Sequence, residues 1–238
     1  MSGFLEWWRK GARMMKRSWG PLLAALCSLA GVFALIVVVG LLARMSAGWT
    51  ATELTVVTGV NDVHSGFFDL VAHAINLGLG PTGAVIVLAV ALAVVAAVTR
   101  SFPAVVRALI QVTVPWALAD VVKVIVQRPR PDSAALPFPT GVDPVTFSYP
   151  SGHAAFAAAL ATWVVLSTAG RAQVIVSILG AVFVVATAWS RMYLGAHYPL
   201  DVTASIILVS VGSLAVYEVC QRVPWFTRRS HTLEAARQ

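Results

Sequence analysis

The chain has 238 residues, of which 58% are hydrophobic and only 11% are charged, with a formal net charge of +7. Soluble domains carry roughly 25% charged residues, so this composition excludes an ordinary soluble protein. It indicates a helical integral membrane protein, because only helices or closed barrels satisfy the backbone in lipid and no alternating barrel strands are visible.

In chain order, the first segment is residues 1–20, which mix Trp, Phe and Met with Lys and Arg. This mixture is typical of a helix lying in the membrane interface. Residues 54–78 are only partly apolar and predict one or two short helices on the outer surface. A membrane span needs about 17–25 residues, and six apolar stretches are predicted to be spans: 21–43, 82–99, 103–125, 152–169, 172–190 and 200–220.

We therefore expect an all-α fold, a six-transmembrane-helix bundle over residues 21–220, followed by a basic tail at 221–238. Lys and Arg gather before the first span, after the last, and in two short loops between them. The positive-inside rule then places both termini in the cytoplasm and the loops 44–81, 126–151 and 190–199 outside. The expected location is the plasma (inner) membrane.

The same distribution of charge explains the value of +7 through topology and anionic lipid, so we expect no nucleic-acid partner. Cys27 and Cys220 lie in or at the edge of spans and predict packing rather than a disulfide or a metal site. Glu218 and Arg222 are four residues apart at the inner end of the last span and predict a structural ion pair.

Polar residues are costly in such a chain, so their position is informative. Three clusters stand out: KVIVQRPRP (Lys123–Pro131), PSGH (Pro150–His153) and SRMYLGAHYPLD (Ser190–Asp201). The first ends the third span, the second begins the fourth, and the third joins the fifth to the sixth. The predicted topology brings all three to one outer mouth of the bundle.

The clusters have the chemistry of a phosphate site. Lys123, Arg130 and Arg191 are cations, and the planar fork of arginine suits bidentate phosphate contacts. Ser151 is predicted as an N-cap, and the start of the helix that follows offers unpaired N–H groups to an anion. Gly152 allows the anion to approach the backbone closely.

Two histidines complete the predicted site. Pro199 is suited to the first turn of the last span, so Asp201 can reach back to His197 and orient its ring as a nucleophile or base. His153 is then the general acid for the leaving oxygen. The alternative is that His153, His197 and Asp201 hold a metal, although no further carboxylate lies at these helix ends.

Two residues are predicted to support the site. Asp120 lies one turn before Lys123 in the same span, and its simplest role is to position that lysine as an i,i+3 partner. Ser190 directly precedes Arg191 within the third cluster.

Taken together, Lys123-x6-Arg130-Pro131, Pro150-Ser151-Gly152-His153 and Ser190-Arg191-x5-His197-x3-Asp201 resemble the three-part signature of the type 2 phosphatidic acid phosphatase family. The resemblance implies that His197 forms a phosphohistidine, that Asp201 orients it, and that His153 protonates the leaving group and later activates water. It implies that Lys123, Arg130, Ser151, Gly152 and Arg191 bind phosphate, without a metal or other cofactor.

The resemblance leaves the substrate open. We expect a lipid phosphatase acting at the outer face, and we favour a polyprenyl diphosphate such as undecaprenyl or decaprenyl diphosphate in carrier-lipid recycling. Phosphatidic acid and phosphatidylglycerophosphate are alternatives, as is transfer of the phosphate to another lipid. A non-enzymatic binder or transporter of anionic lipids is the alternative from another class.

Overall fold

The computed structural model describes residues 19–139 and 146–227, and this part of the chain is helical without β-strands. Its elements are α2 (Gly20–Met45), α3 (Ala47–Asp62), α4 (Gly66–Leu79), α5 (Pro81–Thr99), α6 (Phe102–Val126), the short 3-10 helix η1 (Ser133–Ala135), α7 (Gly152–Leu166), α8 (Gly170–Tyr193), α9 (Pro199–Cys220) and α10 (Pro224–Thr227). Most of the predicted N-terminal segment and C-terminal tail lies outside the described residues.

The predicted spans correspond to α2, α5, α6, α7, α8 and α9, with closely matching ends. Five of these helices are long and apolar enough to cross a membrane, and α7 is the exception at 15 residues. At 1.5 Å per residue α7 is about 22 Å long, whereas a bilayer core is about 30 Å thick. The all-α membrane fold is thus confirmed, while the count of six spans stays a prediction.

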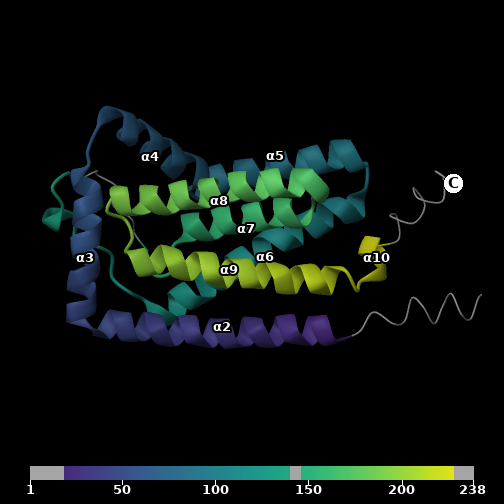
Figure 1. Cartoon of the computed structure of the whole chain (residues 1–238), viewed down its shortest axis with the longest axis horizontal. Coiled ribbons are helices and arrows are strands. Elements are labelled where there is room, and N and C mark those ends of the chain that lie inside the picture. Colours follow the sequence, from purple (N-terminus) through teal and green to yellow (C-terminus); the bar gives the residue numbers. More distant parts are fainter. Residues whose placement is uncertain (1–18, 140–145, 228–238) are drawn as a thin grey trace, which may run out of the picture.

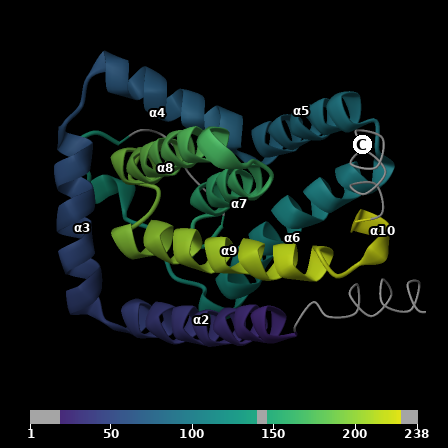
Figure 2. The same ribbon diagram turned by 45° about the vertical axis from the view of Figure 1, so that its right-hand side comes forward.

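The short helix α7 lies at the centre of the bundle, where it packs against α6, α8 and α9 (Figures 1 and 2). Every residue from Ala154 to Ala159 is buried, and five of these six are alanine. Small residues let helices approach closely in a membrane, where dispersion and not the hydrophobic effect drives packing. The alanine-rich sequence of α7 therefore makes it an inner helix.

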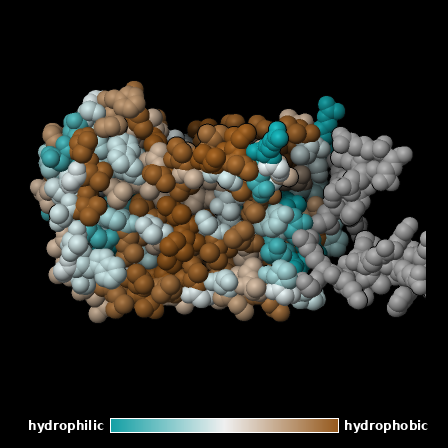
Figure 3. Space-filling model, viewed as in Figure 1, coloured by the Kyte–Doolittle hydropathy of each residue, from teal (hydrophilic) through white to brown (hydrophobic). Residues whose placement is uncertain are grey.

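The bundle has two different ends. Figure 1 shows the start of α2 and the ends of α9 and α10 at one end, and α3 lying across the other. Between the two ends the surface is mainly hydrophobic, and more polar surface gathers toward each end (Figure 3). The start of α2 and the end of α9 thus share a side, as the topology requires. That this side is cytoplasmic remains a prediction.

The helices predicted within residues 54–78 are present as α3 and α4. Each has a serine N-cap: Ser46 accepts from the backbone N–H of Trp49, and Ser65 accepts from that of Phe68. A serine oxygen at this position satisfies one of the N–H groups that a helix start leaves unpaired. Because α4 leads directly into α5, the segment formed by α3 and α4 connects the end of the bundle that α3 crosses to its middle.

Two glycines allow close contacts in the bundle, and one of these contacts places the segment before α7. A Cβ on Gly40 of α2 would overlap the ring of Tyr149, and the Tyr149 hydroxyl donates to the carbonyl of Ile36 at 2.7 Å. On α9, a Cβ on Gly212 would press on Pro115 and Leu118 of α6. The first contact holds the residues that precede the second polar cluster against α2.

Candidate active site

The three polar clusters predicted from the sequence meet at the end of the bundle that α3 crosses. The backbone N–H of Ser151 donates to the carbonyl of Asp201 at 3.1 Å, which joins the starts of α7 and α9. Arg130 reaches His197, with 3.1 Å between its Nη1 and the ring Nε2. All eight residues predicted to act on phosphate lie on the ends of α6, α7, α8 and α9 or in the adjoining loops.

His197 is buried between α8 and α9. Because the guanidinium of Arg130 can only donate, its contact requires a lone pair on Nε2. The proton of the neutral ring is then on Nδ1, which lies 3.5 Å from Oδ2 of Asp201. Burial, followed by the nearby charges of Arg130 and Lys123, lowers the pKa of His197 well below 6.5. The ring is therefore neutral, with the tautomer that a nucleophile at Nε2 needs.

The carboxylate of Asp201 is completely buried and fully engaged. Its Oδ2 accepts the backbone N–H of Tyr198 at 2.9 Å as part of a capping box at the start of α9. Its Oδ1 accepts from Nη1 of Arg128 at 3.0 Å. These contacts hold the carboxylate near the ring of His197, where Nδ1 of His197 is buried without a hydrogen-bond partner among the described residues. That Asp201 orients His197 stays a prediction.

The start of α7 has the form of an anion site. Ser151 is the N-cap and its carbonyl accepts the hydroxyl of Ser205, which fixes the first turn against α9. A Cβ built on Gly152 meets no atom within 4 Å, so the backbone there borders open space. A helix start with this exposure presents its N–H groups to an anion.

Three cations face this helix start. Lys123 donates from Nζ to the carbonyl of Phe147 at 3.2 Å. Arg130 is held by the carbonyls of Thr146 and Ala196, at 2.6 and 2.7 Å. Burial lowers the pKa of Arg130 to about 10, so it remains charged at neutral pH.

The third cation, Arg191, is buried at the end of α8. Its Nε donates to Oγ of Ser190 at 3.2 Å, and the supporting role of Ser190 stays a prediction. Its Nη1 donates to Oδ1 of Asn76 at 2.7 Å. Nη2 of Arg191 is buried and has no hydrogen-bond partner among the described residues. A buried donor of this kind is costly unless a ligand accepts from it, and a phosphate oxygen would do so.

His153, in the first turn of α7, contacts α4. Its Nε2 lies 3.2 Å from the carbonyl oxygen of Asn76. A carbonyl only accepts, so this contact requires the proton on Nε2. The same asparagine therefore contacts both His153 and Arg191, and it places the proton that a leaving oxygen would need.

Sequence reasoning missed three residues of this site: Glu53, Asn76 and Arg128. Asn76 and Glu53 reach it from α4 and α3, across 115 and 75 residues from their arginine partners. Arg128 lies inside the first cluster, between Lys123 and Arg130. The sequence RPRP at residues 128–131 was the only signal that could have pointed to it. The structure thus adds a contribution from the outer helices that the motifs do not contain.

The supporting role of Asp120 for Lys123 stays a prediction. Asp120 is exposed and forms no ion pair with Lys123 within 4 Å in the described part of the chain, but its charge acts on Lys123. The Nζ of Lys123 donates to the carbonyl of Phe147. Among the described residues, no group of three or more His, Cys, Asp or Glu side chains could hold a metal ion.

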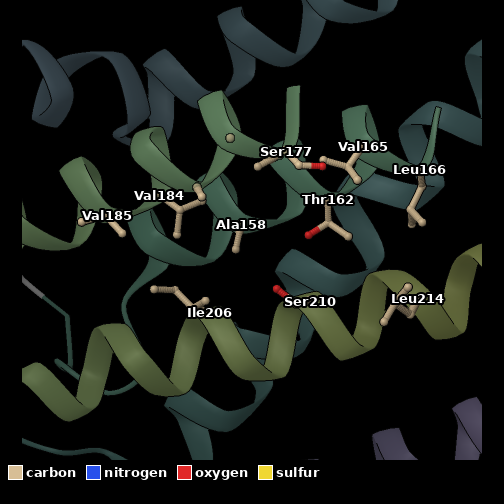
Figure 4. A pocket seen from close by; sticks show the side chains of 13 residues that line it. Ala158, Thr162, Val165, Leu166, Ser177, Val184, Val185, Ile206, Ser210 and Leu214 are labelled. Atoms are coloured by element: carbon tan, nitrogen blue, oxygen red, sulfur yellow. The ribbon is translucent and has the colours of Figure 1, made fainter. Parts of the chain in front are cut away.

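An apolar groove of about 410 Å³ runs along α7, α8 and α9, the helices that carry most of the site. Its lining includes Ala158, Thr162, Ile206 and Ser210 (Figure 4). Ile206 also packs on the buried cluster of Ala154, Ala188 and Val202, which lies between the groove and the polar residues. The groove therefore borders the membrane side of the bundle and is separated from the catalytic candidates.

The comparisons with known proteins cover most of this structure. The family model of the PAP2 superfamily matches residues 84–225, more than half of the chain. The chain also resembles the crystal structure of the first transmembrane PAP2 type phosphatidylglycerolphosphate phosphatase from Bacillus subtilis, with a TM-score of 0.69 and 18% identity over 82% of this chain and 97% of that one. No curated protein matches the chain.

Proposed function

The chain belongs to the PAP2 superfamily, and on this premise we propose that it is a membrane lipid phosphatase acting through His197. The observation that carries the proposal is the state of that residue: a buried, neutral imidazole with its Nε2 lone pair directed at Arg130 and its Nδ1 facing Asp201. A binding site for lipid phosphate needs cations and N–H groups, but it has no use for an oriented nucleophile.

In the proposed first step, phosphate oxygens replace the present partners of Arg130 and Arg191 and approach the start of α7. Nε2 of His197 attacks phosphorus, and the bond between phosphorus and the lipid oxygen breaks. His153 enters this step as an imidazolium with a proton on each ring nitrogen, and its Nε2 proton goes to that leaving oxygen, which leaves the ring neutral. The Nδ1 proton stays on His197, where the carboxylate of Asp201 stabilises the positive charge that forms on the ring.

In the second step, water attacks phosphorus and the bond from Nε2 of His197 to phosphorus breaks. The neutral His153 takes one proton from the water, so inorganic phosphate leaves and the starting protonation states return. Lys123, Arg130 and Arg191 supply the positive charge that balances the phosphate throughout. We therefore expect phosphate release to continue in EDTA.

The proposed substrate is a lipid with a phosphomonoester or diphosphate headgroup, because the site opens at the end of a membrane bundle and its residues recognise phosphate. A polyprenyl diphosphate is the substrate that the sequence favours. Phosphatidylglycerophosphate becomes an equal candidate, since it is the substrate named for the similar Bacillus subtilis enzyme. We place the site on the extracytoplasmic side, which rests on the positive-inside rule.

The experiment is phosphate release by the purified protein in detergent with EDTA, from polyprenyl diphosphate, phosphatidic acid and phosphatidylglycerophosphate in parallel. His197→Ala is the matched variant. Release from any of these lipids that His197→Ala abolishes supports the proposal, and the rates rank the substrates. Loss of activity in EDTA with recovery on adding a divalent ion would contradict the proposed charge balance.

Product analysis separates hydrolysis from transfer to another lipid, since only transfer leaves the phosphate on lipid. Equal release by wild type and His197→Ala, or no release from the whole panel, would contradict hydrolysis through this residue.

A further inference from the structure

A buried row of three charged side chains connects α3 to His197. Glu53 of α3 accepts from Nη2 of Arg128 at 2.6 Å, and Arg128 donates from Nη1 to Asp201 at 3.0 Å. The second oxygen of Glu53 accepts the backbone N–H of Leu200 at 2.7 Å, at the start of α9. All three charged side chains are buried, so their charges act on one another through little water.

The charges in this row do not cancel. Glu53 and Asp201 are carboxylates and Arg128 is the single cation between them, which leaves one net negative charge. If Glu53 were absent, the positive charge of Arg128 at Oδ1 would neutralise the negative charge of Asp201. Glu53 offsets Arg128 from behind, so the negative charge of Asp201 remains effective at Nδ1 of His197, 3.5 Å away.

We propose that Glu53 and Arg128 are positioning residues for phosphoryl transfer: Arg128 holds the carboxylate of Asp201 in place, and Glu53 balances the charge of Arg128 so that a net negative charge faces His197. This inference rests on the proposed function, because it assigns these residues a part in the activation of His197. It extends the catalytic site to α3, which lies across the end of the bundle (Figure 1).

The attachment of α3 does not need these charges. Asn61 of α3 donates to the carbonyls of Phe138 and Tyr193, at 3.0 and 2.8 Å. Val57 of α3 is buried against Leu136 and Tyr198. Burial of three charges is an expensive addition to a helix that neutral contacts already hold. The position of the row beside His197 gives these charges a role that attachment does not.

The other charged or titratable groups around this row determine how a change of its net charge would affect the basicity of His197. His197 is faced by Lys123, Arg130, Arg191 and His153, and the first three are cations. Tyr149 and Tyr198 face Arg128 and Glu53, and burial raises the pKa of both phenols, so they stay neutral. Asp201 is thus the carboxylate that opposes several positive charges at His197, and weakening it makes the ring less basic.

The test is a double-mutant cycle with Glu53→Gln, Arg128→Gln and the combination of both. The net charge of the row is −1 in the wild type, 0 in Glu53→Gln, −2 in Arg128→Gln and −1 again in the double variant. We expect each single change to lower kcat by about 10- to 100-fold with KM within about 3-fold, and the double variant to be more active than either single one. A simple loss of attachment would make the double variant the worst of the three.

The pH profile gives a second readout. Glu53→Gln removes negative charge behind Asp201, so the acid limb of kcat/KM, which reports His197, should move to lower pH. Glu53→Asp keeps the charge and should leave the limb in place, which decides the question if Glu53→Gln does not fold. An unchanged kcat and limb in a folded Glu53→Gln, or a double variant no better than the worse single one, would overturn the proposal.

Orthovanadate binding separates this inference from the proposed function, because it needs no lipid substrate. We expect wild type to bind vanadate, His197→Ala to lose it, and Glu53→Gln to bind about tenfold more weakly. Vanadate binding that follows this order while no lipid is hydrolysed would support the inference and reject the lipid substrates. Lipid hydrolysis with vanadate affinity equal in wild type and Glu53→Gln would reject the inference alone.

Discussion

The two ends of the bundle contain the same chemical pair in different settings. At one end, Glu53 and Arg128 form an ion pair at 2.6 Å. At the other end, Glu218 and Arg222 form an ion pair at 2.6 Å, which the sequence predicts. The first pair joins residues 75 apart and its side chains are 9% and 1% exposed; the second joins residues four apart that are 24% and 13% exposed. The first pair extends to Asp201, the carboxylate that we propose acts on His197.

The comparison extends to aromatic contacts. Arg128 lies 4.1 Å from the centre of the Tyr198 ring, and Arg107 lies 5.3 Å from that of Tyr217 at the other end. A partly exposed pair of residues four apart in sequence at the end of a helix is screened by water more than a buried pair, and it contributes less. A buried pair from distant segments is costly to form and is expected where it has a chemical role. Both pairs consist of a glutamate and an arginine, so residue type does not distinguish them. They differ in how deeply they are buried and in whether they contact a further charged residue of the candidate site.

The largest effect that would sharpen this contrast is at His197. We expect His197→Ala to lower kcat at least ~10³-fold, because removal of a covalent nucleophile leaves only binding and charge stabilisation. Phosphate release at saturating substrate measures it, with the unfolding temperature as control. A variant that folds and keeps more than a tenth of the activity would contradict the assignment of the nucleophile.

A smaller effect is expected at the start of α7. Gly152→Ala adds a methyl group that meets no protein atom within 4 Å, so stability should be unchanged. The methyl group would occupy the space from which phosphate approaches the helix start, and a displacement of about 1 Å can reduce the rate by ~10²-fold. Kinetics and thermal unfolding of the same preparation check both statements, and full activity would show that phosphate does not approach there.

Next in size is the effect of one added charge at Asn76. Asn76→Asp keeps an oxygen acceptor for Arg191 but adds a negative charge beside the phosphate, so KM should rise about tenfold. Asn76→Leu, which removes the acceptor without adding charge, is the companion variant and should lower kcat as well. A KM that is unchanged in Asn76→Asp would mean that phosphate does not bind near Arg191.

The pH dependence follows from the lowered pKa of His197, whose main cause is burial. His197 is neutral in the folded protein at pH 6.5, so kcat/KM should fall on the acid side only below that value. The sign for stability agrees: the unfolded chain binds this proton first, so this contribution to stability is present above about pH 6.5 and is lost as pH falls further. An acid limb centred above pH 7 would contradict a buried neutral histidine.

The smallest effect belongs to the other end of the bundle. Glu218→Gln should leave kcat within about twofold and reduce the free energy of unfolding by about 1 kcal/mol, because this pair is only partly buried. It is the matched control for Glu53→Gln, because the same change is made in the same kind of pair. A large loss of activity in Glu218→Gln would erase the distinction between the two ends.

The sequence predicts a large part of this molecule for physical reasons. The apolar stretches match the helices because hydropathy is a local property, and the alternation of spans brings the three clusters to one end. Glu53 and Asn76 could not be found in this way. Their partners depend on how α3 and α4 lie on the bundle, and that orientation is set by packing contacts such as those of Asn61 and Val57, which a single sequence does not display.

The placement of α3 also has a consequence for biosynthesis. Glu53 is translated before Arg128, and Arg128 before Asp201, so the ribosome delivers these charges with long intervals between them. Until α9 inserts, the ion pair of Glu53 and Arg128 lacks its partners from that helix, the carboxylate of Asp201 and the backbone N–H of Leu200. The row closes only when the final long helix docks, so a truncated chain would display charged groups that a completed one conceals.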